Sequence, residues 1–319
     1  MLALLGACVT PATFSALQQD QPVTPVFEPE HNRFVSFDGA ELGLTVWEVE
    51  APEIVIVGVH GMNDYANAFH MAAPYWAERS VMTYAYDQRG FGRSVGRGDW
   101  PEEELMREDL RTAVNLARER HPDAVLAVVG ISMGAAMTMT AFGSDRPPQG
   151  VDRLVLSGPG LRGWGAIPLY QRFALWAAVR VRPGWVVRPP RGVKIEPSDN
   201  IEMLRRHWQD PIPLRSNKIE QVHGVVTVME NAHKAAPDLP ASVPTLLTYG
   251  AKDIVIPEPG LRRTAKILAP HVRTAYYPQG YHMILRDLNA EIVHEDVLTF
   301  LRDPKAPLPS GVSEVPGRN

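Results

Sequence analysis

Residues 125–134 read VLAVVGISMG, an apolar run that passes through Gly130, Ser132 and Gly134 into an Ala- and Met-rich segment. Glycines two positions before and after the serine allow a strand and a helix to approach closely around a sharp, strained turn. The sequence therefore predicts a strand, a turn and a helix, with the Ser132 hydroxyl presented at the helix N-terminus, as in a nucleophile elbow. The Gly-x-Ser-x-Gly pattern also arises by chance in a chain with 25 glycines, and an ordinary helix-capping serine is the alternative.

Two further loops follow predicted strands and carry an acid and then a histidine. Asp253 comes after the apolar run at 244–249, and His282 comes 29 positions later, after the run at 272–277 and a Pro/Gly turn. The carboxyl ends of parallel strands meet at one edge of a sheet, where such sheets bind ligands. We therefore expect Ser132, Asp253 and His282 to lie together. The alternatives are an aspartate that makes an Asx-turn and a plain surface histidine.

These residue types suit acyl transfer through a covalent intermediate. A serine hydroxyl needs a base to remove its proton, which predicts that His282 is the base and that Asp253 orients the imidazole and stabilises its cation. The tetrahedral oxyanion needs two donors. We expect these to be the backbone N–H groups of Met133, directly after the nucleophile, and of Met62, in the loop after an earlier apolar run. His60, at the start of that loop, is expected to brace it, and the chemistry requires no cofactor.

Five motifs occur along the chain in a fixed order, and as a set they are far more specific than any one alone. They are His60-Gly61-Met62, Tyr86-Asp87-Gln88-Arg89-Gly90-Phe91-Gly92-Arg93-Ser94, the elbow at 130–134, Gly250-Ala251-Lys252-Asp253 and Tyr281-His282. With these motifs the chain resembles, over roughly residues 31–302, the α/β-hydrolases of the monoglyceride lipase and lysophospholipase type, which are related to the serine aminopeptidase group. The resemblance implies an α/β-hydrolase fold.

The loop after His60 departs from that family. Relatives of the monoglyceride lipase kind usually show a small residue and then Gly-Glu-His, whereas this chain reads Met62-Asn63-Asp64-Tyr65. A backbone oxyanion donor survives such changes, because it does not depend on the side chain. A preference for glycerol esters therefore does not follow from the resemblance.

Apolar runs alternate with helical segments along the chain, which predicts a mostly parallel eight-stranded sheet with helices on both faces. The first two strands are expected to form an antiparallel hairpin around Asp38-Gly39. We expect one hydrolase domain over residues 31–302, after an N-terminal signal or tether at 1–30 and before a disordered tail at 303–319. The expected strands are 33–37, 42–49, 54–59, 81–86, 125–130, 152–157, 244–249 and 272–277, and the clearest helices are 101–120 and 287–301.

The gap between the strands expected at 152–157 and 244–249 is too long for one crossover, which predicts a helical cap over residues 160–240. Four of the seven tryptophans fall there, and residues 161–195 contain seven basic residues and no acid. Aromatic and aliphatic residues with basic flanks suit an anionic membrane surface or a lipid headgroup. The alternative is a cap that packs its apolar face on the core and leaves its arginines in water.

The first eight residues, Met1-Leu2-Ala3-Leu4-Leu5-Gly6-Ala7-Cys8, resemble the end of a bacterial lipoprotein signal, in which a short box precedes the lipidated cysteine. The apolar stretch is shorter than a usual signal core and has no Lys or Arg before it. Cys8 is the only cysteine, so no internal disulfide can form. We expect a lipid-anchored protein of the bacterial cell envelope with Cys8 lipidated, and a cytoplasmic enzyme is the alternative.

Charge and histidine spacing argue against two other classes of protein. The net charge of -4 gives no overall attraction for nucleic acid. His223 and His233 lack a third ligand at short range, so we expect no metal site.

Taken with the resemblance, these residues predict a serine ester hydrolase that acts on monoacylglycerol-like or lysophospholipid-like esters. A serine aminopeptidase is a second hypothesis; it needs acidic groups to bind a free amino terminus, for which Asp64, Glu196 and Glu230 are the candidates. A non-enzymatic binding module on the same fold is a third. Ser132 at the elbow disfavours the aspartate nucleophile that dehalogenases and epoxide hydrolases of this fold use.

Overall fold

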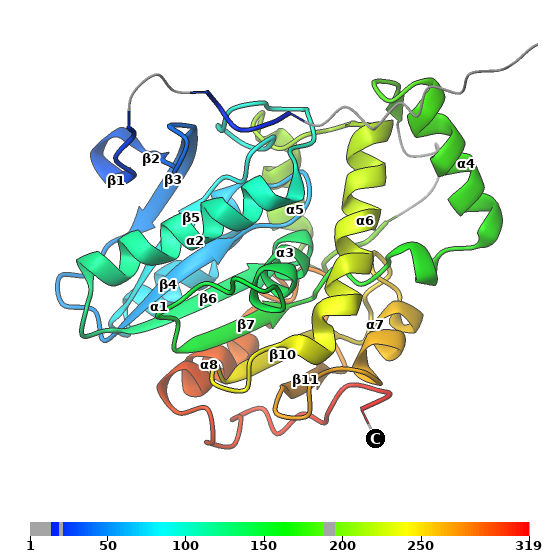
Figure 1. Ribbon diagram of the computed structural model, residues 1–319. Coiled ribbons are helices and arrows are strands. Elements are labelled where there is room, and N and C mark those ends of the chain that lie inside the picture. Colours follow the sequence, from blue (N-terminus) through cyan, green and yellow to red (C-terminus); the bar gives the residue numbers. More distant parts are fainter. Residues whose placement is uncertain (1–13, 19–21, 188–194, 319) are drawn as a thin grey trace, which may run out of the picture.

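A nine-stranded sheet forms the centre of the computed structural model, which describes residues 14–18, 22–187 and 195–318 (Figure 1). The strand order is β1-β2-β3-β5-β4-β6-β7-β10-β11, with β1 to β3 antiparallel and the strands from β5 to β11 parallel. The predicted α/β architecture is confirmed. The strands are β1 (Val26–Glu28), β2 (Arg33–Val35), β3 (Glu41–Trp47), β4 (Ile54–Val59), β5 (Val81–Tyr86), β6 (Val125–Ile131), β7 (Arg153–Ser157), β10 (Thr245–Gly250) and β11 (Arg273–Tyr277).

The sheet has one strand more than the eight that the sequence predicts. The additional strand, β1, has three residues and pairs with β2 in the register Val26 to Val35. A strand this short carries no alternation that a sequence pattern can reveal. Residues 26–28, expected to belong to the tether, therefore form the edge of the sheet. The predicted hairpin forms, since β2 and β3 pair on either side of Asp38-Gly39.

Helices cover both faces of the sheet, because its central strands are apolar on both sides. Every residue of β4 is buried, and its side chains alternate between two cores. Val55 and Val57 belong to the core that includes residues of α2 and α3, and Ile54 and Ile56 to the core that includes residues of α1 and α8. These helices are α1 (Ala72–Ala77), α2 (Glu103–Arg120), α3 (Met133–Phe142) and α8 (Ala290–Arg302).

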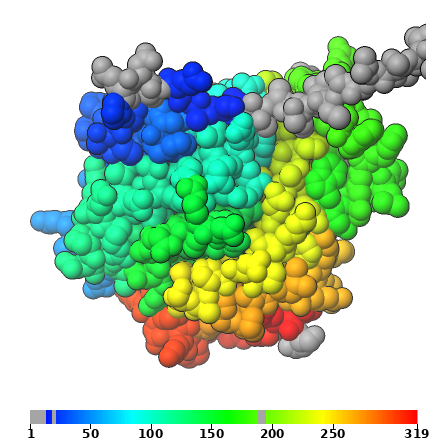
Figure 2. Space-filling view, in the orientation of Figure 1, coloured from blue at the N-terminus to red at the C-terminus, as the bar shows by residue number. Residues whose placement is uncertain are grey.

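The chain leaves the sheet after β7 and returns to it at β10, and the intervening residues form a helical cap. Helix α6 packs on α3, and α4 packs on the outer side of α6 (Figure 1). Figure 2 shows α4 and the residues around it as a flank of the molecule, beside α6. The elements of the cap are α4 (Leu169–Val181), β8 (Val186–Val187), α5 (Ile201–Gln209), β9 (Asn217–Lys218) and α6 (Ile219–Ala235); α7 (Glu258–Ala265) follows β10.

The C-terminal tail differs from the disordered segment that its proline content predicts. Residues 303–318 run along β11, where the Tyr276 N–H donates to the Ser313 carbonyl at 2.8 Å. Val315 is 2% exposed, and the Ser310 N–H donates to the Asp296 carboxylate at 2.9 Å. The amino-acid composition of a segment does not reveal individual contacts such as these hydrogen bonds and the buried Val315 side chain.

Candidate active site

Ser132 lies in the turn between β6 and α3, with φ 53° and ψ -115°. This conformation is strained for a residue with a side chain, and it persists because the surroundings fix it. A Cβ atom on Gly134 would lie 2.2 Å from the Val59 carbonyl oxygen, and one on Gly130 would lie 2.6 Å from the Ala135 Cα. Both glycines are therefore required by the close approach of β6, α3 and the end of β4. The strand, turn and helix predicted from residues 125–134 are present.

The three candidate side chains form one hydrogen-bonded chain. Ser132 Oγ lies 2.9 Å from His282 Nε2, and His282 Nδ1 lies 2.7 Å from Asp253 Oδ2. The other carboxylate oxygen, Asp253 Oδ1, accepts the N–H groups of Val255 and Ile256, each at 2.8 Å. An acceptor at Nδ1 keeps the proton on that nitrogen, so the Nε2 lone pair faces the serine hydroxyl. The arrangement can deprotonate Ser132 and hold the resulting imidazolium.

The loop after β4 passes directly beside the serine. A Cβ on Gly61 would lie 3.1 Å from Ser132 Cβ, which places the next residue, Met62, at the nucleophile. Met133 is the first residue of α3, where a helix leaves its N–H groups without helical partners. Among the described residues, neither the Met62 nor the Met133 N–H is occupied by a backbone acceptor, which the expected role as an oxyanion donor requires.

His60 braces this loop. It is fully buried, with Nδ1 2.7 Å from the Gly61 carbonyl oxygen and Nε2 accepting the Gln88 N–H at 2.8 Å. Burial lowers the pKa of His60 and outweighs the nearby Asp87 carboxylate, which favours the charged form. A neutral imidazole with both nitrogens occupied fixes the loop and has no free position for proton transfer to a substrate.

The second motif lies beneath the site and is structural. Arg89 is fully buried and donates to Asp38 at 2.6 and 2.8 Å and to Asp109 at 2.6 and 2.8 Å. Asp87 accepts the Ala66 N–H at 2.8 Å. The Arg89 bonds hold the loop after β5 against the β2–β3 turn and α2, and the Asp87 bond holds it against the segment that follows the Met62 loop.

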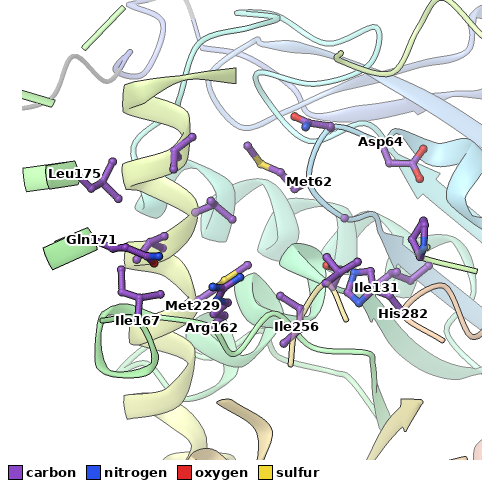
Figure 3. Close-up of a pocket in the computed structure, with 18 of the residues that line it drawn as sticks. Met62, Asp64, Ile131, Arg162, Ile167, Gln171, Leu175, Met229, Ile256 and His282 are labelled. Carbon is purple, nitrogen blue, oxygen red and sulfur yellow. The ribbon is translucent and has the colours of Figure 1, made fainter. Parts of the chain in front are cut away.

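A cavity of about 710 Å³ opens on Ser132 and His282 (Figure 3). The part of the cavity away from His282, here called the aliphatic arm, is lined by side chains of α4, α6 and the residues just before α4, and Figure 3 shows Leu175 far from His282. This size and an apolar lining with few polar groups are typical of sites that bind small organic molecules. The aliphatic residues lining the arm are Ile167, Ala174, Leu175, Ala178, Val222, Val225, Val226 and Met229.

Residues 50–289 match the model of the hydrolase family described as serine aminopeptidase, S33. The chain belongs to this family. The match spans well over half of the chain and includes all five motifs.

The alignments of this S33-family hydrolase with its curated and solved relatives cover nearly the whole length of each relative. A monoacylglycerol lipase from Mycolicibacterium smegmatis is 27% identical over 277 residues, which are 85% of this chain and 96% of that protein. The structure of a Paleococcus ferrophilus monoacylglycerol lipase has a TM-score of 0.68 at 22% identity and covers 82% of this chain and 98% of its own. A soluble variant of Saccharomyces cerevisiae monoglyceride lipase, solved with a substrate analogue, has a TM-score of 0.72 at 16% identity, covering 89% and 96%. The α/β-hydrolase fold and the resemblance to the monoglyceride lipase type are confirmed.

At the His282 end, the cavity of this S33-family hydrolase carries a charged pair, of which the sequence pointed to Asp64 but not to Arg286. Arg286 donates to Asp64 at 2.6 Å, and both side chains are buried. Burial acts to raise the pKa of Asp64, but the Arg286 charge outweighs it and the pKa lies below its usual value. Within the described chain, Arg286 Nη1 and Asn63 Oδ1 are buried without a hydrogen-bond partner. No motif marks Arg286, which stands where the sequence reads as the start of a helix.

The acids that an amine-binding site needs are not gathered in the cavity. Asp64 lines it but is paired with Arg286. Glu230 is paired with Arg263 at 2.7 Å, a hydrogen bond that lowers the pKa of Glu230 to about 2. Glu196 is exposed. Among the residues that the structure describes, no group of three His, Cys, Asp or Glu side chains could hold a metal ion.

Proposed function

We propose that this S33-family hydrolase cleaves carboxylic esters of the monoacylglycerol or lysophospholipid type through an acyl-enzyme on Ser132. The observation that carries the proposal is the hydrogen-bonded chain of Ser132, His282 and Asp253 at the mouth of an apolar cavity. The family and its lipase relatives support an ester substrate.

The reaction follows from the geometry. His282 Nε2 removes the Ser132 proton as Oγ attacks the ester carbonyl, and Asp253 stabilises the imidazolium that forms. The Met62 and Met133 N–H groups stabilise the oxyanion. His282 then returns the proton to the leaving alcohol, and water, deprotonated by the same imidazole, releases the acid.

The two ends of the cavity suit the two parts of such an ester. The leaving alcohol departs beside His282, because His282 protonates it. Arg286 Nη1 and Asn63 Oδ1 lie at that end as a buried donor and a buried acceptor, which an alcohol bearing further polar groups satisfies. The aliphatic arm between α4 and α6 then takes the acyl chain, whose burial supplies apolar binding energy.

We also propose that the outer face of α4 rests on an anionic lipid surface. Leu169, Tyr170 and Phe173 are 76%, 71% and 70% exposed, and Trp176 is 48% exposed. Apolar residues with basic neighbours on an exposed helix favour an interfacial location. None of the described helices has the length and apolar character to cross a membrane.

Vesicle binding tests this surface. The double substitution Arg180→Glu and Arg182→Glu reverses both charges. It is expected to weaken co-sedimentation with phosphatidylglycerol vesicles and to leave turnover of a short soluble ester unchanged. Arg302→Glu with Lys305→Glu makes the same charge change at the C-terminal end of α8 and serves as the control. Equal loss of binding in both double variants would remove the cap from the proposal.

A lipidated Cys8 and a location in the bacterial cell envelope remain part of the proposal, and a cytoplasmic enzyme is the alternative. Cys8 lies outside the described residues. Intact-mass analysis of natively expressed protein decides between them, because a processed and diacylated Cys8 and an unprocessed terminus give different masses.

The ester proposal is tested with wild type and Ser132→Ala on short nitrophenyl esters, monoacylglycerols, lysophospholipids and aminoacyl anilides. We expect turnover of the long-chain esters that falls on the order of 10⁴-fold or more in the variant. Activity confined to anilides would favour the aminopeptidase, whose pocket would then have to bind an amine without a free acid. Full activity in Ser132→Ala would overturn the nucleophile, and silence in both proteins would favour a binding module.

A further inference from the structure

The loop that carries His282 is fastened to the segment that leads back from the outer cap into α5. Residues 197–200 lie alongside residues 281–288 and form four hydrogen bonds with them. The contacts include Met283 N–H to the Pro197 carbonyl at 2.8 Å, Leu288 N–H to Asp199 Oδ1 at 2.8 Å, and Asn200 Nδ2 to the Arg286 carbonyl at 3.1 Å.

Asp287 is the side chain that joins both segments. Its Oδ2 accepts the N–H of Tyr281, the residue before His282, at 2.8 Å. Its Oδ1 accepts the Ser198 hydroxyl, on the cap segment, at 2.7 Å. Asp287 is 5% exposed and Ser198 is 1% exposed, so both bonds are largely shielded from bulk water. The carboxylate spans the junction, and Asp287 is not among the residues that line the substrate cavity.

We propose that Asp287 is a positioning residue. It fixes the backbone of the loop that carries His282 and holds this loop in a defined position relative to the cap segment at 197–200. The inference rests on the proposed function, because it assigns His282 the role of base. A carboxylate that accepts a hydrogen bond at both oxygens fixes the Tyr281 backbone. The position of the His282 imidazole depends on this backbone, because His282 is the next residue. Displacing a catalytic group by about 1 Å costs on the order of 100-fold in rate.

The charge of Asp287 also reaches His282. Burial raises the pKa of Asp287 to about 6, against the bonds from Tyr281 and Ser198 and the attraction of His282, which favour the carboxylate. An anion here stabilises the imidazolium by the same attraction. The other titratable groups around it are Asp199, and across the adjoining cavity of about 610 Å³ Tyr75, Tyr277, Glu291 and Glu295.

Three variants test the proposal with a short soluble ester, a serine-directed fluorophosphonate and the pH profile of kcat/KM. Asp287→Ala is expected to lower kcat and the labelling rate by 10-fold or more, with KM within about threefold, since the cavity lining is untouched. Asp287→Asn keeps the shape: its carbonyl accepts the Tyr281 N–H and its amide donates to Ser198. It is expected to restore kcat at pH 8 and to move the acid limb to lower pH, because the anion that favours the imidazolium is gone. Ser198→Ala is expected to fall between them.

Wild-type kcat and an unmoved acid limb in Asp287→Asn, with Ser198→Ala also like wild type, would overturn the proposal even if Asp287→Ala failed to fold. Labelling separates this result from failure of the proposed function. If wild type reacts with the fluorophosphonate but hydrolyses no ester, the substrate assignment fails, and the labelling rates of the variants still decide the role of Asp287.

Discussion

Helices α6 and α4 both belong to the cap and both line the cavity, yet they are built differently. Helix α6 buries residues along its length, including Val228 and Ala232, against α3, whereas Val179 is the single buried residue of α4. The cavity face of α4 consists of Gln171, Ala174, Leu175 and Ala178, at helical spacing, and its other face carries Leu169, Tyr170, Phe173 and Trp176.

Helix α6 is therefore part of the folding core, and α4 is not. Burial of α6 stabilises the fold, because its apolar face is removed from water. The aromatic face of α4 stays in water and contributes little to folding, so folding does not account for it. Changes in the core, in the contacts of α6 and on α4 should therefore have effects of decreasing size on the isolated enzyme.

The largest effect is expected in the core, at Asp253. Asp253→Asn keeps the size of the side chain but cannot hold the proton on His282 Nδ1 in the required tautomer, so kcat should fall about 10⁴-fold. The unfolding midpoint should change little. Steady-state kinetics on a soluble ester measure the loss, and Asp238→Asn, at an exposed aspartate, is the matched control. A loss below tenfold would contradict the triad.

The next effect is on stability. Arg89→Met leaves the buried carboxylates of Asp38 and Asp109 without their cation, which should cost about 3–5 kcal/mol of unfolding free energy. Denaturant unfolding followed by tryptophan fluorescence measures it. Arg205→Met, at a side chain that is 73% exposed, should change the same quantity by less than about 0.5 kcal/mol. Similar values for the two variants would show that the network beneath the site is dispensable.

The residues of this core were largely predictable from sequence, and those of the cap were not. Apolar runs bounded by turns marked the strands, and Gly130, Gly134 and the order of Asp253 and His282 marked the site, because sterics and chain order restrict those positions locally. Arg286 and Asp287 follow His282 without a motif, since their roles depend on Asp64 and Ser198, which are distant in sequence. The long gap between the strands expected at 152–157 and 244–249 predicted that a cap exists. Which face of α4 is exposed depends on how α4 packs against α6, and no local pattern shows that.

A smaller, pH-dependent effect is expected where α6 meets the rest of the molecule. Glu230 on α6 accepts Arg263 of α7 at 2.7 and 2.8 Å and the Gly165 N–H of the outer cap at 2.8 Å. Its pKa is about 2 in the folded state against an ordinary 4.5, so its contribution is complete above pH 4.5 and is lost as the pH falls towards 2. With solvent screening, Glu230→Gln should cost about 1–2 kcal/mol at pH 7.

Chemical denaturation of both proteins at pH 7, 4 and 2.5 checks the sign. The difference between wild type and Glu230→Gln should shrink steadily over that series. Glu202→Gln, at a carboxylate that is 62% exposed, is the control and should give a difference near zero at every pH. A gap that widens in acid would mean that the Glu230 contacts do not favour the carboxylate.

The smallest effect on the isolated enzyme is expected on α4 itself. Phe173→Ser with Trp176→Ser should change the unfolding free energy by less than about 1 kcal/mol, because Phe173 is 70% exposed and Trp176 is 48% exposed. Val228→Ser on α6, at a side chain that is 1% exposed, should cost about 2–3 kcal/mol for the same kind of replacement. Turnover of a short soluble ester should be unchanged in the α4 variant, and turnover of long-chain ester presented in phosphatidylglycerol vesicles should fall. If the α4 variant instead loses as much stability as Val228→Ser, its aromatic face is part of the fold, and the distinction between the two cap helices fails.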